Sequence, residues 1–149
     1  MLLLDTNHCF SIIAGHPLFL DRLRHVGWEG ILTSVVVAGE LYYGASISEQ
    51  ADENTFRVSR FLRSIDVVPI SSSVAGQYAH LKMALLNRFG PRERARRRDF
   101  DLAKLGFRDN DLWIAATAID RGAMLVSADS DFTRMREAID LVITDWTRS

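Results

Sequence analysis

The sequence predicts an α/β protein in which a parallel sheet is covered by helices on both faces. Short apolar runs alternate along the chain with longer segments of helical periodicity, the pattern of repeated strand–helix–strand units. The first run, Met1 to Leu4, is continuously apolar, as expected for a strand buried on both faces at the centre of such a sheet. The chain has 149 residues, which is enough for one hydrophobic core, so we predict a single domain over residues 1–149.

Composition narrows the class of protein. Apolar residues make up 48% of the chain and charged residues 25%, both ordinary for a globular protein. No apolar run approaches the roughly 20 residues of a membrane span. Residues 1–4 are too few for a signal peptide and lack a basic leader. Cys9 is the only cysteine, so an internal disulfide is excluded, and we expect a cytoplasmic location.

The predicted elements follow in order along the chain. Apolar runs bounded by polar residues or glycine predict strands at 1–4, 31–33, 67–70, 123–126 and 141–143. Helical periodicity predicts helices at 9–14, 17–26, 35–48, 54–64, 74–88, 110–121 and 131–138. Side chains that accept hydrogen bonds at helix starts predict the caps Thr6 or Asn7, Ser34, Ser71–Ser73, Asp109, and Asp129 or Ser130. Pro69 favours an edge position for its strand.

Acids follow two of the predicted strands. Asp5 comes directly after the first strand, and Asp129 and Asp131 follow the strand 123–126. The carboxyl ends of the strands in an open α/β sheet form the edge where ligands bind. Ser127 lies between the strand and these acids, where its hydroxyl would orient an acid or a bound water.

Glu40 lies within the predicted helix 35–48. The residues three and four positions away on its face are all non-polar: Val36, Val37, Tyr43 and Gly44. An unpaired buried carboxylate is costly, and a metal ion or an arginine would offset that cost. The alternative is a glutamate at the edge of the apolar stripe that reaches water or a salt bridge.

Asp111 repeats this pattern near a helix start. Its face carries Ile114, Ala115 and Ala118, and the two small alanines would let the helix pack closely on the sheet. The alternative is a first-turn acid stabilised by the helix dipole, and Asp109 is in turn explained by its role as the cap.

The four separated acids together suggest a metal site. Carboxylates are hard oxygen ligands that suit Mg²⁺ or Mn²⁺. Without a metal they would repel one another, and at least one pKa should rise. With a metal they would support activation of water and stabilisation of the leaving oxygen in phosphodiester hydrolysis.

Arginine is concentrated in one segment. Residues 88–98 hold six arginines and one glutamate, while the whole chain has a net charge of -1. This asymmetry suggests a phosphate-bearing partner, with Arg94, Arg96, Arg97 and Arg98 as candidate contacts. The alternative is a solvated helix or a mobile loop.

Other site chemistries fit less well. The four histidines show no ligand spacing with one another or with Cys9, which argues against zinc. No phosphate loop or dinucleotide-binding fingerprint is present. An aspartyl phosphate at Asp5 would want a second acid two residues on, where the chain has Asn7. A non-catalytic module that holds an arginine-rich peptide in an acidic cleft stays as an alternative.

Four ordered segments carry these acids: Leu3-Leu4-Asp5-Thr6-Asn7, Gly39-Glu40-Leu41-Tyr42-Tyr43-Gly44, Asn110-Asp111-Leu112-Trp113-Ile114-Ala115-Ala116 and Leu125-Val126-Ser127-Ala128-Asp129-Ser130-Asp131-Phe132. Over nearly its whole length the chain resembles PIN-domain nucleases, specifically the VapC-type toxins of type II toxin–antitoxin pairs. Asp145-Trp146 is also similar to the ending of that family.

The resemblance implies a five-stranded parallel sheet in a three-layer sandwich. It also implies a Mg²⁺- or Mn²⁺-dependent endoribonuclease that forms a homodimer and is inhibited by a small antitoxin protein. The residues implied for catalysis and metal binding are Asp5, Glu40, Asp111 and Asp129, and we predict supporting roles for Asn7 and Ser127. A nuclease that processes RNA outside a toxin–antitoxin pair is the alternative.

Two features depart from the family pattern. The arginine-rich stretch at about 91–105 resembles an insertion that no family motif covers. The last motif has acids at both Asp129 and Asp131, and we favour Asp129 as the metal ligand because it is nearer the strand.

Overall fold

A central sheet of five parallel strands organises the protein, as predicted. The computed structural model describes residues 1–148, and the strand order across the sheet is β3-β2-β1-β4-β5. The strands are β1 (Leu2–Leu4), β2 (Ile31–Ser34), β3 (Asp66–Val68), β4 (Met124–Val126) and β5 (Ile143–Thr144). The predicted domain range of 1–149 includes Ser149, which lies outside the described residues.

The first strand lies at the centre of the sheet, which confirms the interpretation of its apolar run. β1 pairs with β2 on one side and with β4 on the other. Leu3 and Leu4 are completely buried. β3 is an edge strand, as Pro69 predicted, but it ends at Val68, so the proline lies just outside it.

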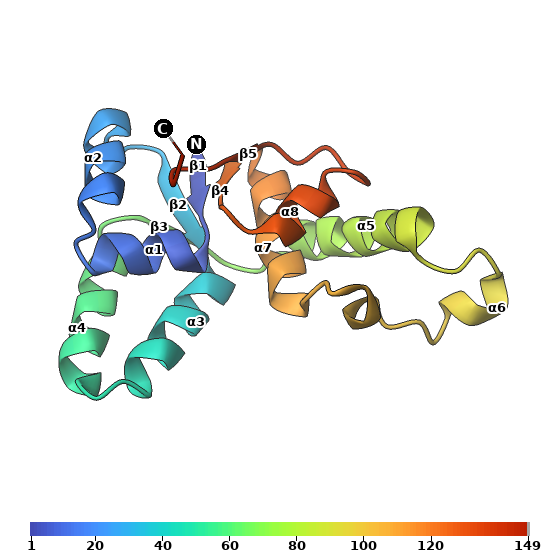
Figure 1. The fold of residues 1–149 in the computed structure, drawn as a ribbon, viewed down its shortest axis with the longest axis horizontal. Coiled ribbons are helices and arrows are strands. Elements are labelled where there is room, and N and C mark those ends of the chain that lie inside the picture. Colours follow the sequence, from blue (N-terminus) through green and yellow to red (C-terminus); the bar gives the residue numbers. More distant parts are fainter. Residues whose placement is uncertain (149) are drawn as a thin grey trace.

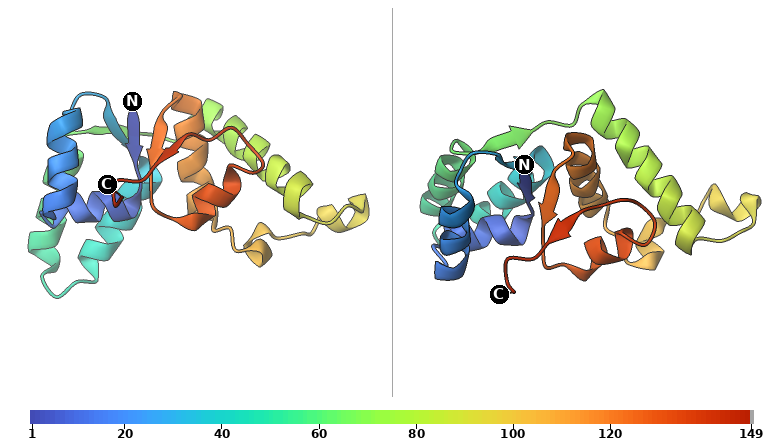
Figure 2. Two further views of the ribbon diagram at one scale, coloured as in Figure 1. Left: turned by 45° about the horizontal axis from the view of Figure 1, so that its top comes forward. Right: turned by 90° about the horizontal axis from the view of Figure 1, so that it is seen from above.

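Helices cover the sheet on both sides (Figures 1 and 2). They are α1 (Thr6–Ile13), α2 (Pro17–Val26), α3 (Val35–Ser46), α4 (Ala51–Leu62), α5 (Ser72–Phe89), α6 (Arg94–Arg97), the short 3-10 helix η1 (Leu102–Leu105), α7 (Asp109–Arg121) and α8 (Ser130–Met135). The views place α1 to α4 on one side of the sheet and α5, α7 and α8 on the other. None of the helices among residues 1–148 is long and apolar enough to cross a membrane.

The packing of α7 brings its first turn to the carboxyl end of the sheet. Ala115 and Ala118 on its inner face are completely buried, so the helix lies close to the strands, as their small size predicted. On its other side α7 packs along α5, where the rings of Tyr78 and Trp113 stack with centroids 3.7 Å apart. These contacts hold the first turn of α7 beside the ends of β1 and β4.

Two predicted helix caps are wrong. Asp5, rather than Thr6 or Asn7, caps α1, because its carboxylate accepts a hydrogen bond from the backbone N–H of His8. A carboxylate fills this role as well as a hydroxyl or an amide does. Arg108, rather than Asp109, is the N-cap residue of α7, and it makes no side-chain capping bond.

The other differences concern where elements begin and end. α8 ends at Met135 rather than at 138, and the last strand is 143–144 rather than 141–143. Leu141 is 4% exposed, so its apolar character reflects core packing rather than strand pairing.

The arginine-rich segment forms a short arm. α6 and η1 follow α5, and α6 lies beyond the C-terminal end of α5, at the end of the molecule opposite α1 to α4 (Figure 1). α6 therefore extends away from the sheet, whereas η1 packs on the core, where Leu102 is buried.

Candidate active site

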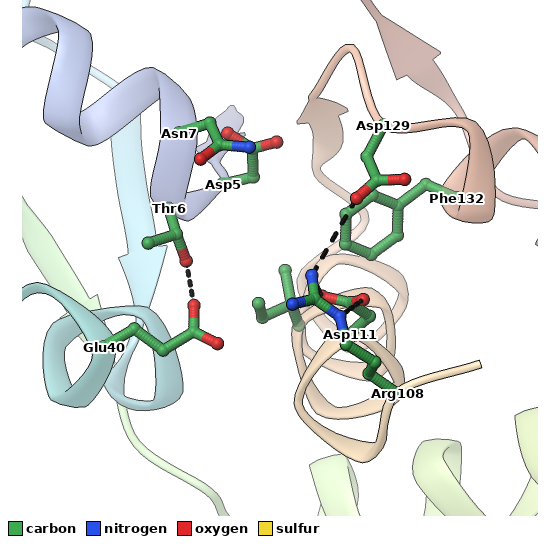
Figure 3. Close-up of a pocket in the computed structure, with 9 residues that line it drawn as sticks. Asp5, Thr6, Asn7, Glu40, Arg108, Asp111, Asp129 and Phe132 are labelled. Carbon is green, nitrogen blue, oxygen red and sulfur yellow. Dashed lines mark hydrogen bonds and ion pairs between the residues drawn. The ribbon is translucent and has the colours of Figure 1, made fainter. Parts of the chain in front are cut away.

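A pocket of about 170 Å³ opens at the carboxyl ends of β1 and β4 (Figure 3). It is lined by Asp5, Thr6, Asn7, Glu40, Arg108, Asp111, Ile114, Asp129 and Phe132. The four acids predicted from the separated motifs therefore meet in one place. Asn7 lines the same pocket, whereas Ser127, Asp131 and the arginines of α6 do not.

Asp5 is fixed from beneath by the helix that it caps. Its Oδ1 accepts the backbone N–H of His8 at 2.8 Å and lies 2.8 Å from the Nδ1 of the same residue. Asp5 is 5% exposed, and among residues 1–148 no hydrogen-bond donor contacts its Oδ2. One oxygen is thus held by the protein, and the other is left for a ligand.

His8 holds Asp5 from within the core. Its ring is 2% exposed and packs edge-on against Phe19 and Trp146. The carboxylate of Asp5 can only accept, so Nδ1 carries the proton in this contact. The buried Nε2 has no hydrogen-bond partner within the described chain. The short distance and the close packing leave the ring little freedom to turn away from Asp5.

Glu40 reaches the pocket from α3. Its Oε2 accepts the hydroxyl of Thr6, and its Oε1 accepts the side-chain amide of Asn110 at 2.9 Å. Glu40 is only half-buried and Tyr43 on the same face is 68% exposed, so this face of α3 is not buried in the core. The alternative of a glutamate at the edge of the apolar stripe holds, with two neutral donors in place of a salt bridge.

Asp111 is the most deeply buried of the four acids, at 3% exposure. Arg108 lies one turn before it, with Nε 3.0 Å from Oδ2 and Nη2 3.5 Å from Oδ1. Burial raises the pKa of Asp111, and the charges of Asp129 and Glu40 raise it further, while Arg108 lowers it. Because burial is the largest effect, the net pKa is raised above its ordinary value.

Asp129 caps α8 and presents its second oxygen to the pocket. Its Oδ1 accepts the backbone N–H of Asp131 at 2.9 Å, and its Oδ2 lies 3.9 Å from Nη2 of Arg108. The hydroxyl of Ser127 accepts the backbone N–H of Asp129 at 3.1 Å. This hydrogen bond ties Ser127 to the turn that carries Asp129.

Asp131 is turned toward a different arginine. Its Oδ1 lies 3.5 Å from Nη1 of Arg134. Even so, carboxylate oxygens of Asp111, Asp129 and Asp131 lie within 4.8 Å of one another. Asp129 lines the pocket and Asp131 does not, so the geometry favours Asp129 as the ligand. Asp131 lies next to Asp129, outside the pocket lining.

The donor set fits a hard divalent cation. The residues facing the pocket offer carboxylate oxygens from four elements and no sulfur or imidazole ligand, which is the choice of Mg²⁺ or Mn²⁺. The Oδ2 of Asp5 has no donor within residues 1–148, so a cation in the pocket would satisfy it.

Sequence reasoning missed several residues of the site. Arg108, His8, Thr6 and Asn110 all bond to the predicted acids. Helical spacing held a signal for two of them, because Arg108 is three residues before Asp111 and His8 is three residues after Asp5.

The candidate RNA-binding arginines are far from this chemistry. Arg94, Arg96 and Arg98 are exposed on the arm. Arg97 is instead used by the protein, since it donates to the backbone carbonyl of Pro91 at 2.8 Å and to the side chain of Asn87 at 2.7 Å.

Comparison with known proteins identifies the family. The PIN domain model matches residues 2–138. The chain belongs to the PIN domain family. The resemblance found in the motifs and the predicted three-layer α/β fold are both confirmed.

Similar PIN proteins carry the VapC name. "Ribonuclease VapC2" of Rickettsia felis is 26% identical over 148 residues, covering 98% of this chain and 98% of the relative. "Ribonuclease VapC2" of Haemophilus influenzae is 28% identical over 147 residues, covering 97% and 96%. A crystal structure of VapBC2 from Rickettsia felis bound to a promoter DNA fragment contains a chain with a TM-score of 0.75 and 26% identity, with coverage of 97% and 98%.

Proposed function

We propose that this PIN protein is a Mg²⁺- or Mn²⁺-dependent endoribonuclease toxin that hydrolyses RNA phosphodiester bonds and is neutralised by a small antitoxin. One observation carries the proposal: carboxylates from four separate elements, Asp5, Glu40, Asp111 and Asp129, line a single pocket. Such a concentration of negative charge is costly unless a cation balances it.

The residues of the pocket would have different roles in metal binding and in substrate positioning. When bound, the divalent ion would lower the pKa of a water and stabilise charge on the phosphate oxygens. Asp5 would offer its free Oδ2, and Asp111 and Asp129 would offer oxygens from the opposite side. Glu40 is held by two neutral donors, so its charge faces the same space without being neutralised. Asn7 at the pocket wall would position RNA or water.

Relatives support the choice of substrate and partner. The named relatives are ribonucleases, and the similar structure is a complex of VapB and VapC proteins. We therefore propose RNA as the substrate, an antitoxin as the partner, a homodimer as the assembly and the cytoplasm as the location. The arm at 91–105 would be an insertion in the single PIN domain.

The test is cleavage of RNA by the purified protein with and without metal. We expect cleavage with Mg²⁺ or Mn²⁺, arrest by EDTA, and loss of cleavage in Asp111→Asn. Asp140→Asn is the matched control, because Asp140 is an exposed acid outside the pocket. Cleavage that persists in EDTA, or full activity in Asp111→Asn, would contradict the proposal.

The cleavage assay, together with co-expression, separates the alternatives. A non-catalytic acidic-cleft module would bind an arginine-rich peptide and would not cleave RNA under any metal condition. A processing nuclease would cleave RNA but would have no inhibitory partner. Co-expression with a small protein encoded directly upstream distinguishes these cases, because a toxin should then be purified as an inactive complex.

A further inference from the structure

The guanidinium of Arg108 lies between two of the proposed metal ligands (Figure 3). Its Nε is 3.0 Å from Oδ2 of Asp111, and its Nη2 is 3.9 Å from Oδ2 of Asp129. The chain thus places a positive charge of its own at the carboxylates that a divalent ion would use. Because an unpaired buried carboxylate is costly, the positive charge of Arg108 stabilises the buried Asp111 in the metal-free protein.

An arginine and a divalent ion compete for these oxygens. A Mg²⁺ ligand must lie at about 2.0–2.1 Å from the ion in near-octahedral geometry. The oxygens of Asp111 already face the guanidinium, and a second cation there would be repelled by it. Arg108 in this position therefore opposes binding of a metal to Asp111 and Asp129.

The surroundings of Arg108 allow such a movement. Its side chain is 69% exposed, and within the described chain its hydrogen bonds and ion pairs go only to Asp111 and Asp129. Arg134 shows the opposite arrangement, because it donates to the carbonyl of Leu105 at 2.8 Å and lies 4.3 Å from the ring centroid of Phe107. Arg134 is anchored by a backbone hydrogen bond and by packing on an aromatic ring, whereas the side chain of Arg108 is held only by the carboxylates that it contacts.

The position of Arg108 also limits where it can go. Its backbone is fixed as the N-cap residue of α7, so the displaced side chain stays at the mouth of the pocket. A guanidinium presents several donors in one plane, which fits two oxygens of a phosphate. An RNA phosphate that enters the pocket would meet this side chain.

We propose that Arg108 exchanges between two anions: the carboxylates of Asp111 and Asp129 before the metal binds, and the RNA phosphate afterwards. This inference rests on the proposed metal-dependent nuclease. Arg108 thereby lowers the affinity of the free protein for the ion and adds a substrate contact once the ion is in place.

The test compares Arg108→Gln with wild type in two measurements. In calorimetric titration with Mn²⁺ alone we expect the variant to bind at least about fivefold more tightly, the low end of coupling between linked sites. At saturating Mn²⁺ we expect a higher KM for RNA. Arg108→Lys should lie between the two, because it keeps the charge and loses the planar fork. Arg121→Gln is the control, since Arg121 is exposed at the other end of α7.

The outcomes are distinct from those of the proposed function. Unchanged or weaker Mn²⁺ binding in Arg108→Gln, with normal binding in wild type, would overturn the exchange and leave the nuclease proposal standing. Tighter Mn²⁺ binding with an unchanged KM would overturn the phosphate contact. Absence of Mn²⁺ binding in wild type would overturn the metal site itself. Partial unfolding of the variant would weaken metal binding, so it cannot imitate the expected result.

Discussion

The two sides of the acidic pocket are built differently. On one side, Glu40 is held by the neutral donors Thr6 and Asn110, and Asp5 by the backbone N–H and the ring Nδ1 of His8. On the other side, Asp111 and Asp129 face the charged guanidinium of Arg108. Neutral donors fix the direction of a carboxylate and leave its charge in place, whereas an arginine also offsets that charge.

This difference assigns the two sides different tasks. The side of Asp5 and Glu40 is preorganised, because its oxygens need not change partner to face a cation. The side of Asp111 is exchangeable under our proposal, because the guanidinium of Arg108 competes with a metal ion for its oxygens. The pocket therefore combines one fixed wall with one wall on which Arg108 and a metal ion compete.

The largest expected effect is on the fixed side. Asp5→Asn keeps an N-cap side chain for α1, so the fold should stay intact. It removes the charge of a carboxylate whose Oδ2 faces the pocket without a donor, so we expect RNA cleavage to fall by at least about 10²–10³-fold, the usual cost of losing one charge-stabilising group. The rate of RNA cleavage at saturating Mg²⁺ checks this. A rate within about threefold of that of the control Asp140→Asn would refute the prediction, because the expected decrease is far larger.

The next prediction concerns the support behind Asp5. His8→Leu removes the Nδ1 contact at 2.8 Å, and we expect the affinity for Mn²⁺ to fall by about 10-fold, the low end for loss of an outer-shell partner. His8→Asn should restore much of the affinity, because its amide can donate in place of Nδ1. Calorimetry with both variants checks this. Equal affinities for the Leu and Asn variants would show that the side chain of His8 contributes by packing and not through its hydrogen bond to Asp5.

A third prediction concerns how Asp111, on the exchangeable side of the pocket, affects the thermal stability of the metal-free protein. The pKa of Asp111 is raised by burial from its ordinary value of 3.8, so its protonated form is favoured in the folded state. Its contribution to stability is therefore fully present below about pH 3.8 and is lost as the pH rises through the raised pKa. Asp111→Asn at pH 7 should then raise the melting temperature in EDTA by about 2–4 °C, equivalent to about 1 kcal/mol.

Glu40→Gln should act in the opposite direction. Both oxygens of Glu40 accept hydrogen bonds, and an amide would place a donor against Thr6 or Asn110. We expect a lower melting temperature in EDTA, by a similar few degrees. Thermal melts of the two variants side by side check the comparison, and equal shifts of the same sign would contradict it.

The smallest expected effect lies on the arm, outside both sides of the pocket. If Arg94, Arg96 and Arg98 bind the RNA backbone, changing all three to Gln should weaken RNA binding and lower its log–log salt slope by roughly one unit for each arginine that binds a phosphate. Turnover at saturating RNA should change little. Arg97 is best left in place in this variant, because its bonds to Pro91 and Asn87 hold the arm. An unchanged salt slope would remove the RNA role of the arm.

Sequence patterns predicted the fold and the meeting of Asp5 with Asp129, because both follow from local periodicity. The leucines before Asp5 indicated the central strand, and parallel strands bring their carboxyl ends to one edge. Boundaries were less predictable where two explanations share one pattern. Leu141 is apolar because it packs in the core, and the sequence does not distinguish this from strand pairing.

The polarity of the site was harder to predict than its location. Whether Glu40 faces the core or a pocket depends on how α3 is rotated against α1 and α7, which is a tertiary property. The pairing of Arg108 with Asp111 depends on the direction of a long side chain at a helix start, which the sequence restricts only weakly. The different hydrogen-bond partners on the two sides of the pocket could therefore be found only from the structure.

Titration of the purified protein with Mn²⁺ tests most directly whether both sides hold one ion. Calorimetry on wild type, Asp5→Asn, Asp111→Asn and the control Asp140→Asn compares the fixed and exchangeable sides in one experiment. We predict one binding event in wild type and in Asp140→Asn, and strongly weakened binding in either pocket variant. Undiminished binding in Asp5→Asn or in Asp111→Asn would contradict a shared metal site.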